Sequence, residues 1–128
     1  MRIGADYYPE HWEKERWKTD AEMMVKANIK VTRIGEFAWS LYEPEEGKYE
    51  FDWMDEALDF FGKYGIKVVM CTPSATPPKW MIDKYPDILQ NDIHGNPKLF
   101  GTRKHYCFNS QTYREKTKKL NTLIAKRY

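Results

Sequence analysis

The chain has 128 residues, of which 41% are hydrophobic and 31% charged, a composition typical of globular domains that excludes a disordered tail or a membrane protein. Its formal net charge is only +2, with acidic and basic residues interspersed, so we expect neither nucleic acid nor a membrane surface as a partner. Aromatic residues make up 16% of the chain and suit either a packed core or a stacking surface for flat or ring-shaped ligands.

The N-terminus and the cysteines predict a cytoplasmic protein. Residues 1–6 lead directly into a strand-like segment without the apolar stretch of a signal peptide, and no window approaches the apolar length of a membrane span. Cys71 and Cys107 are the only cysteines, too few for a disulfide framework, which suits a reduced compartment.

The first elements alternate between strand and helix. A short apolar and aromatic run predicts a strand over residues 3–8. A helix follows, and its apolar face is predicted to consist of Trp17, Ala21, Met24 and Val25. Asn28 closes that helix, and the β-branched run Ile29–Ile34 predicts a second strand that ends at Gly35. Together these elements form a βαβ unit.

A second helix and a third strand repeat the alternation. Residues 43–48 form a polar loop, after which Asp52 is expected to cap a helix that carries acidic residues in its first turn. Its buried stripe is predicted to consist of Met54, Ala57, Leu58 and Phe61. Gly65 suits the left-handed exit of this helix, and residues 66–72 predict a strand that prolines end.

The rest of the chain is predicted to hold two helices and a long connection. Residues 78–85 suit a short helix, and residues 86–109 form a connection of the length and composition typical of binding loops. Thr112 and Glu115 match a capping box that begins a last helix. The apolar face of that helix is predicted to consist of Tyr113, Leu120, Leu123 and Ile124. Its basic residues are expected to form its solvent-exposed side rather than a nucleic-acid patch: Lys116, Lys118, Lys119, Lys126 and Arg127.

The alternation predicts a parallel sheet of the α/β class, either an open doubly wound sheet or a closed barrel. A nucleotide-binding open sheet would carry a glycine-rich phosphate loop after its first strand, and this sequence has none. Polar and aromatic residues instead gather after the predicted strands, at residues 8–10, 36–39 and 73–80, as they do in a (β/α)8 TIM barrel. A complete barrel takes about 250 residues. We therefore expect residues 1–128 to be the N-terminal portion, about three βα units, of an incomplete barrel.

Four blocks of sequence resemble glycoside hydrolase family 42. They are GADYYPEHW at residues 4–12, RIGEFAWS at 33–40, TPPKW at 76–80 and RKHYC at 103–107. The blocks occur in the family's order, so the resemblance covers nearly the whole chain.

The resemblance implies a TIM-barrel catalytic domain that removes terminal non-reducing β-D-galactose from β-galactosides with retention of configuration, often as a homotrimer. Retaining hydrolysis uses two carboxylates, one as acid/base and one as nucleophile. In the family the acid/base glutamate follows an asparagine at the end of the fourth strand, and the nucleophile comes several strands later. Both positions fall beyond Tyr128, so no residue here takes a catalytic role, and we expect this polypeptide alone to be inactive.

Three residues are candidates for substrate binding. The resemblance assigns Arg103 to the sugar, and a guanidinium suits this role because it offers several fixed donors to hydroxyl oxygens. The alternative is a solvated loop arginine. Arg33 and Glu36 flank the end of the second strand, where side chains can point into a barrel mouth. For these two the alternative is a structural ion pair at the barrel rim.

Cys107 is the one candidate metal ligand. It matches a cysteine that, in some family members, joins three later cysteines at a structural zinc. The hypothesis is a structural zinc in the complete protein and no cofactor for catalysis; the alternative is a small buried thiol. His11, His94 and His105 show no shared metal spacing.

Two other functions fit parts of the same pattern. A barrel hydrolase that acts on another glycoside would share the architecture, because a fold does not determine which sugar is bound. A non-catalytic carbohydrate-binding protein would hold a saccharide on the same aromatic strand-end residues without cleaving it. An Asn-Glu pair after a fourth strand would favour the enzyme.

Overall fold

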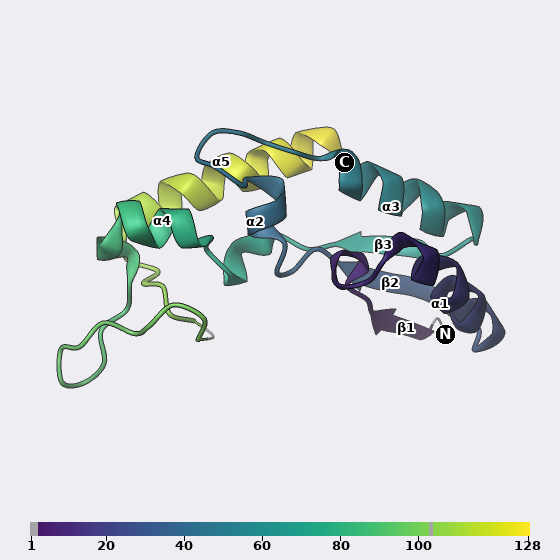
Figure 1. Ribbon diagram of the computed structural model, residues 1–128, viewed down its shortest axis with the longest axis horizontal. Helices are drawn as coiled ribbons and strands as arrows, with labels where there is room; N and C mark the ends of the chain where they lie inside the picture. The colour runs from purple at the N-terminus through teal and green to yellow at the C-terminus, as the bar shows by residue number, and fades with distance from the viewer. Residues whose placement is uncertain (1–2, 103) are drawn as a thin grey trace. The chain divides into compact units, whose positions relative to one another are not determined.

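The computed structural model describes residues 3–102 and 104–128 (Figure 1). The chain forms two compact units, each made of two stretches of sequence. The first unit comprises Met1–Glu36 and Glu50–Cys71, and the second comprises Phe37–Tyr49 and Thr72–Tyr128. The first unit thus holds the strands, whereas the second holds segments that follow strands in the sequence.

The first unit is built on a parallel three-stranded sheet in the order β1-β2-β3. The strands are β1 (Ile3–Asp6), β2 (Ile29–Ile34) and β3 (Lys67–Met70). The strand register shifts between Ile3 and Gly4, and a Cβ built on Gly4 would lie 3.0 Å from the carbonyl oxygen of Val31. This close approach of the two backbones favours glycine at that position.

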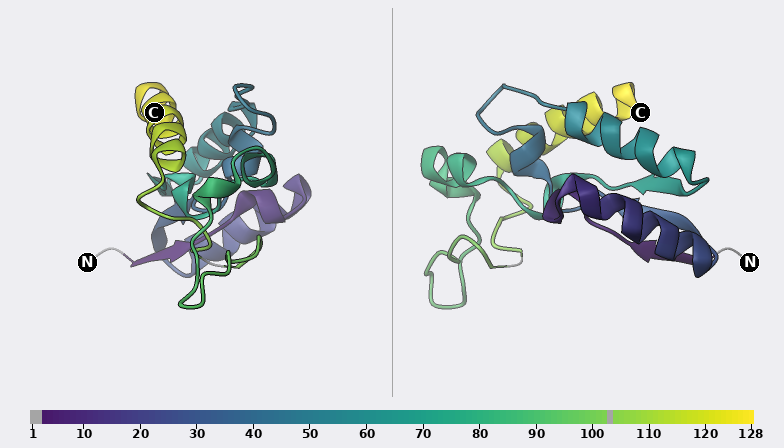
Figure 2. Two further views of the ribbon diagram at one scale, coloured as in Figure 1. Left: turned by 90° about the vertical axis from the view of Figure 1, so that its left-hand side faces the viewer. Right: turned by 45° about the vertical axis from the view of Figure 1, so that its right-hand side comes forward.

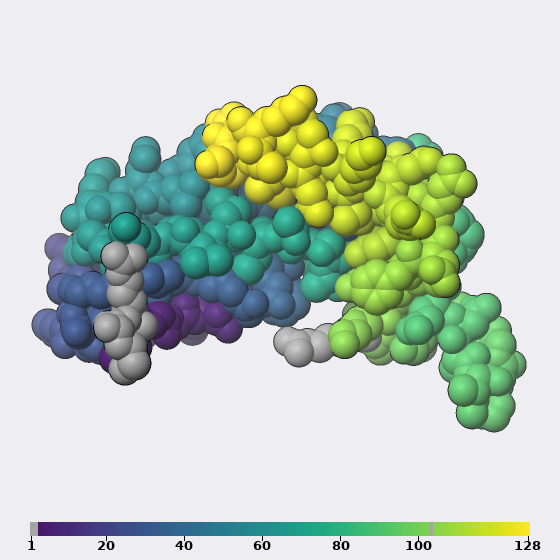
Figure 3. Space-filling model, turned by 180° about the vertical axis from the view of Figure 1, so that it is seen from behind, coloured from purple at the N-terminus to yellow at the C-terminus, as the bar shows by residue number. Residues whose placement is uncertain are grey.

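Helices α1 (Lys14–Lys26) and α3 (Asp52–Lys63) cover one face of the sheet (Figures 1 and 2). Thr32 and Ile34 of β2 are fully buried, whereas Val69 of β3 is 51% exposed. Figure 3 shows the strands at the surface on the side away from these helices. A parallel sheet covered by helices on one side is the arrangement of a (β/α)8 barrel, whose other face lines the barrel interior. The predicted fold class is confirmed.

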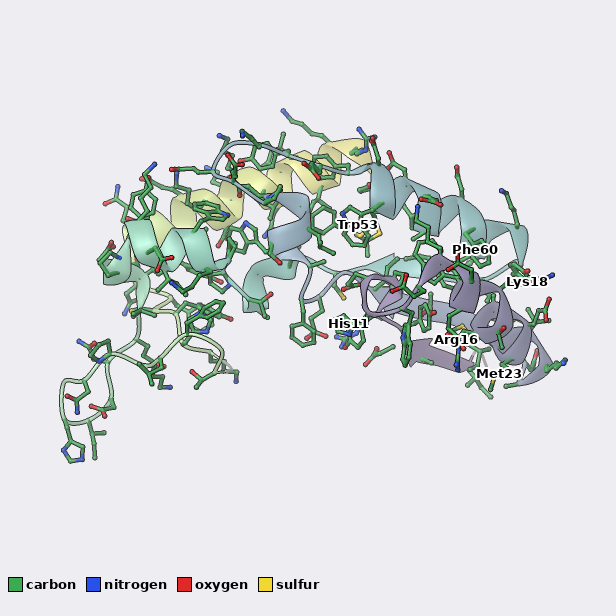
Figure 4. All side chains as sticks on the ribbon, in the orientation of Figure 1. His11, Arg16, Lys18, Met23, Trp53 and Phe60 are labelled. Carbon is green, nitrogen blue, oxygen red and sulfur yellow. The ribbon has the colours of Figure 1, made fainter. Side chains whose placement is uncertain are left out.

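Aromatic rings fill the space between α1 and α3. The ring of Trp17 lies 6.4 Å from that of Phe61 and 5.8 Å from that of Phe60, which projects between the two helices (Figure 4). The Trp17 indole also donates to the carbonyl oxygen of Pro9 at 3.0 Å, so its polar atom is satisfied in the core. Truncating a fully buried phenylalanine such as Phe61 to alanine typically costs about 3–5 kcal/mol of folding free energy.

Several predicted details of the first unit are corrected by the structure. β1 ends at Asp6 rather than at residue 8, because Pro9–His11 turns into a short 3-10 helix. Asp52 is the first residue of α3 rather than its cap, and its carboxylate complements the helix dipole from the first turn. Val25 is 42% exposed, and Leu58 is only partly buried, so neither is a full member of the predicted apolar faces.

The second unit is helical. It contains α2 (Trp39–Tyr42), α4 (Lys79–Lys84) and α5 (Gln111–Arg127). The rings of Tyr106 and Tyr113 stack at 4.5 Å, and the Tyr113 hydroxyl donates to the carbonyl oxygen of Ser74 at 2.8 Å. The other fully buried apolar side chains of this unit include Trp39, Tyr42, Met81, Ile88 and Leu120.

Helix α5 begins two residues earlier than its predicted capping box. Ser110 is the cap residue, and its hydroxyl accepts from the backbone N–H of Tyr113 at 3.3 Å. Thr112 is already helical, so the predicted pairing of Thr112 with Glu115 as a capping box is wrong. The helix α2 was not predicted because a single turn is too short to show helical periodicity.

The connection over residues 86–109 is more ordered than its composition predicts. It begins with a 3-10 turn, Pro86–Ile88, and continues as two short antiparallel bridges, Leu89 with Tyr106 and Asn91 with Pro97. At the tip, the Asp92 carboxylate accepts from the backbone N–H groups of two later residues in the turn. Within residues 3–102 and 104–128, no helix is long and apolar enough to cross a membrane.

Candidate functional site

The carboxyl ends of β1 and β2 bring together three charged side chains, Asp6, Arg33 and Glu36, here called the strand-end cluster. Arg33 Nε donates to Asp6 Oδ1 at 2.8 Å, and Arg33 Nη2 donates to Glu36 Oε2 at 2.6 Å. Asp6 and Arg33 are register partners in the sheet, so strand pairing itself sets the first contact. One guanidinium therefore bridges two carboxylates, which leaves the cluster with an excess of negative charge.

Gly35 shapes the cluster from the backbone. Its φ of 86° lies in the left-handed region, which glycine adopts without the steric cost that a side chain imposes. The chain turns there directly after β2, and Glu36 can therefore return its carboxylate to Arg33, three residues earlier.

The strand-end cluster is partly open to solvent. The side chains of Asp6, Arg33 and Glu36 are 53%, 42% and 27% exposed, respectively. Ion pairs with this exposure contribute only about 0–1 kcal/mol to stability. The ion pair between Arg33 and Glu36, which was the structural alternative to substrate contact, is present. Because both side chains are partly exposed, this pair contributes little to the stability of the fold. Substrate contact by Arg33 and Glu36 stays a prediction.

Tyr8 joins the strand-end cluster through its hydroxyl. This hydroxyl donates to Glu36 Oε2 at 3.4 Å and also hydrogen-bonds with Arg33. Desolvation, and then the negative charges of Glu36 and Asp6, raise the pKa of Tyr8 above its ordinary value. The ring of His11, labelled in Figure 4, lies 5.3 Å from that of Tyr8. The arrangement offers carboxylate acceptors, guanidinium donors and aromatic faces, the groups that bind sugar hydroxyls and rings.

Cys71 follows β3 and faces the same charges. Its backbone N–H donates to the carbonyl oxygen of Ile34 at 2.9 Å, which continues the pairing of β2 and β3 by one residue. Desolvation raises the pKa of its thiol; the charge of Arg33 lowers it, and the charges of Glu36 and Asp6 raise it further. The raised pKa makes the Cys71 thiol less readily ionised than an ordinary cysteine.

The second unit contains a separate pocket of about 260 Å³. It is lined by Phe37 and Ser40, by residues 76–79, by residues 100–102 and by His105. His105 belongs to the block that was predicted to carry the sugar-binding arginine, and residues 100–102 directly precede that block. Arg103 itself lies outside the described residues.

Cys107 lies at the start of the turn that leads to α5. It is a free thiol and partly buried, and its backbone N–H donates to the carbonyl oxygen of Ile88 at 2.7 Å. In the part of the chain that the structure describes, no three His, Cys, Asp or Glu side chains converge as metal ligands. Cys107 is thus a single thiol donor here, and zinc binding stays a prediction.

Sequence patterns missed the cluster around Glu46, in the segment predicted only as a polar loop. Its carboxylate accepts from Lys84, from Lys116 and, at 2.9 Å, from the Tyr85 hydroxyl; these four residues are here called the Glu46 cluster. The three donors lower the pKa of Glu46 to about 2, Lys116 having the largest effect. Lys116 is only 25% exposed, so the prediction that all basic residues of α5 form its solvent-exposed side is wrong for Lys116.

A family model described as beta-galactosidase, that of glycoside hydrolase family 42, matches residues 6–128. The chain is 54% identical over 126 residues to a beta-galactosidase of Thermus thermophilus, covering 98% of this chain and 20% of the relative. It is 48% identical over 128 residues to a beta-galactosidase of Haloferax lucentense, covering 100% of this chain and 19% of the relative.

Solved structures agree with the sequence comparison. A beta-galactosidase from the Antarctic haloarchaeon Halorubrum lacusprofundi is 45% identical, with a TM-score of 0.95 over 100% of this chain and 19% of that one. A cold-adapted beta-galactosidase from Rahnella sp. R3 is 44% identical, with a TM-score of 0.96 and the same coverage. The chain spans about a fifth of the length of the curated relatives it matches. Because the family model covers nearly all of it, this chain belongs to glycoside hydrolase family 42, the beta-galactosidases.

Proposed function

We propose that residues 1–128 form the N-terminal part of the catalytic barrel of a beta-galactosidase. The complete enzyme would hydrolyse terminal non-reducing β-D-galactose residues of β-galactosides. The observation that carries this proposal is the family match over residues 6–128, which takes in the strand-end cluster. In a TIM barrel the site lies at the carboxyl ends of the strands, which is where this cluster is found.

The proposed reaction is a retaining displacement with two glutamates. The two carboxyl groups of such an enzyme lie about 5–5.5 Å apart, one acting as acid/base and the other as nucleophile. Both would come from sequence beyond residue 128. This chain would contribute binding groups: carboxylates of the strand-end cluster would accept from sugar hydroxyls, and Arg33 would hold those carboxylates in place through its hydrogen bonds.

The substrate is tested with the complete protein on nitrophenyl glycosides. We expect the highest kcat/KM on the β-galactoside among the β-galactoside, β-glucoside, β-xyloside and α-L-arabinoside. A preference for another glycoside would replace the substrate in this proposal, and saccharide binding without turnover of any of them would favour a carbohydrate-binding protein. The polypeptide of residues 1–128, assayed beside it, should not exceed a no-enzyme blank, because glycoside cleavage needs both carboxylates.

We also propose that Cys107 becomes a zinc ligand in the complete protein. A partly buried thiol supports the proposal, since a structural zinc site needs thiolate or imidazole donors, usually four. Metal analysis of the complete protein should find zinc that Cys107→Ser removes, while Cys71→Ser leaves it bound. If Cys107→Ser leaves the zinc content unchanged, Cys107 is not a zinc ligand. A homotrimer and a cytoplasmic location remain predictions for the complete enzyme.

A further inference from the structure

Two neighbouring tyrosines after β1 direct their hydroxyls to different carboxylates. The backbone N–H of Tyr7 donates to the carbonyl oxygen of Arg33 at 3.0 Å, so the pairing with β2 continues one residue beyond β1. Successive side chains of such an extended segment point to opposite faces of the sheet. On the helix-covered face, the Tyr7 hydroxyl donates to Asp20 Oδ2 of α1 at 2.9 Å, and Tyr7 is only 8% exposed. On the other face, the Tyr8 hydroxyl donates to Glu36 Oε2 at 3.4 Å.

The Tyr8 hydroxyl completes a ring of hydrogen bonds with Arg33 and Glu36. Arg33 Nη2 donates to Glu36 Oε2 at 2.6 Å, and the Arg33 side chain also hydrogen-bonds with the Tyr8 hydroxyl. A guanidinium can only donate, so the Tyr8 oxygen accepts from Arg33 and its own proton is directed to Glu36. The pKa of Tyr8 is raised, chiefly by desolvation, so the hydroxyl keeps this proton at neutral pH.

This ring of hydrogen bonds fixes one oxygen of the Glu36 carboxylate. Both donors bind Oε2, and two donors from different directions restrict the rotation of the carboxylate more than one donor does. Neither bond uses Oε1, and the Glu36 side chain is 27% exposed, so the carboxylate can still accept from an incoming hydroxyl. Arg33 is shared with Asp6, whereas the proton of the Tyr8 hydroxyl is directed to Glu36 alone.

The backbone and a neighbouring ring hold Tyr8 in place. Its carbonyl oxygen accepts from the backbone N–H of His11 at 3.0 Å, which closes the short 3-10 helix Pro9–His11. The imidazole of His11, labelled in Figure 4, lies 5.3 Å from the Tyr8 ring at an interplanar angle of 31°. The Tyr8 hydroxyl is therefore a donor in a set position, and a binding group works best when such neighbours hold it in the productive orientation.

We propose that Tyr8 is a positioning residue whose hydroxyl, together with Arg33, orients the Glu36 carboxylate to accept from a galactose hydroxyl through Oε1. This inference rests on the function proposed above. It assigns Tyr8 no proton transfer and no contact with the sugar. The effect of Tyr8 on the reaction is transmitted through Glu36.

The two adjacent tyrosines provide a matched pair of substitutions in the complete enzyme, since each phenylalanine removes one hydroxyl. Tyr8→Phe should lower kcat/KM on a nitrophenyl β-galactoside about three- to tenfold, mostly through KM, the scale of one hydrogen bond. Its melting temperature should stay close to that of the wild type. Tyr7→Phe should lower the melting temperature and leave kcat/KM within about twofold, because its hydroxyl ties β1 to α1 in the core.

A double-mutant cycle tests whether the effect of Tyr8 passes through Glu36. Adding Tyr8→Phe to Glu36→Ala should cost little beyond Glu36→Ala alone, because residues that act through one another are not additive. A structural effect of Tyr8, or a direct bond from Tyr8 to the sugar, would add its full loss to that of Glu36→Ala. Thermal unfolding accompanies each assay, and Glu36→Ser replaces Glu36→Ala if the alanine variant does not fold.

Several outcomes would overturn the inference. Additive losses in the cycle would show that Tyr8 acts independently of Glu36. Equal losses of kcat/KM in Tyr7→Phe and Tyr8→Phe, or none in Tyr8→Phe, would leave Tyr8 without a role in binding. Unchanged activity of Glu36→Ala would remove this inference while an active wild type keeps the beta-galactosidase. A wild type inactive on every galactoside would remove the proposed function as well, so the two failures are distinguishable.

Discussion

The strand-end cluster and the Glu46 cluster use the same kinds of groups in opposite proportions. In the first unit, one guanidinium serves two carboxylates, and the side chains of Asp6 and Arg33 are about half exposed. In the second unit, one carboxylate receives two ammonium groups and a phenol, and Glu46 and Lys116 are each only 25% exposed.

The difference separates a cluster suited to a ligand from one suited to the fold. Glu46 accepts from two consecutive residues at the end of α4 and from Lys116 of α5, so it ties a loop to two helices. Its oxygens are occupied by donors of the chain itself. The strand-end cluster has more hydrogen-bond acceptors than donors, and it is open to solvent. A sugar hydroxyl can therefore reach the cluster and donate to its carboxylates.

The largest effect on activity is expected for Arg103, which belongs to neither cluster and which the family resemblance assigns to the sugar. In the complete enzyme, Arg103→Ala should lower kcat/KM on galactosides about ten- to a hundredfold, the scale of a charged hydrogen bond worth about 1.5–3 kcal/mol. The pH profile should stay unchanged, because an arginine remains protonated and cannot be a general acid or base. Near-wild-type kcat/KM at a normal melting temperature would make it only a loop arginine.

The Glu46 cluster should instead govern stability and its pH dependence. The pKa of Glu46 lies at about 2 in the fold, below its ordinary value of 4.5. A group whose pKa is lowered by folding stabilises the folded state above its unfolded pKa, and this contribution is lost as the pH falls from about 4.5 towards 2. Glu46→Gln should therefore lower the melting temperature at about pH 7 and have less effect at about pH 3.

Thermal unfolding of the complete protein at both pH values measures this effect. Glu45→Gln is the matched control, because Glu45 pairs only with Lys48 among the described residues and both side chains are about two-thirds exposed. An effect of Glu46→Gln that is the same at both pH values would show that the Glu46 carboxylate is not held ionised by its partners.

The smallest expected effect concerns the start of α5, the helix that carries Lys116. Ser110→Ala should cost about 1 kcal/mol of folding free energy, because Ser110 caps the helix through the Tyr113 N–H. Thr112→Ala should cost less, since Thr112 lies inside the helix. Denaturant unfolding of both variants measures this difference. A larger loss of folding free energy for Thr112→Ala than for Ser110→Ala would show that Thr112 caps the helix, as the sequence predicts.

Local patterns were sufficient to predict the framework of the fold. The run from Ile29 to Ile34 forms β2 with its predicted bounds, and α4 falls within residues 78–85, because β-branched runs and helical spacing report on local structure. The boundaries at Asp52 and Thr112 were wrong, since several neighbouring polar residues can each cap a helix and packing decides between them.

The candidate site was predictable only where strand order determines it. Arg33 and Glu36 were predicted because they flank the end of a strand, and the parallel register then places Asp6 beside Arg33. The Glu46 cluster joins residues 38 and 70 positions apart, and no local pattern contains that information.

The most direct test removes one cation from each cluster of the complete enzyme and measures both kcat/KM on a β-galactoside and the melting temperature. Arg33→Gln should lower kcat/KM by about tenfold or more, the scale of a charged hydrogen bond, with little change in melting temperature. Lys116→Gln should lower the melting temperature and leave kcat/KM within about twofold, because its partner Glu46 holds the loop and not the substrate. The reverse pattern, or equal effects of the two substitutions on both quantities, would contradict the division of the two clusters into a binding site and a structural tie.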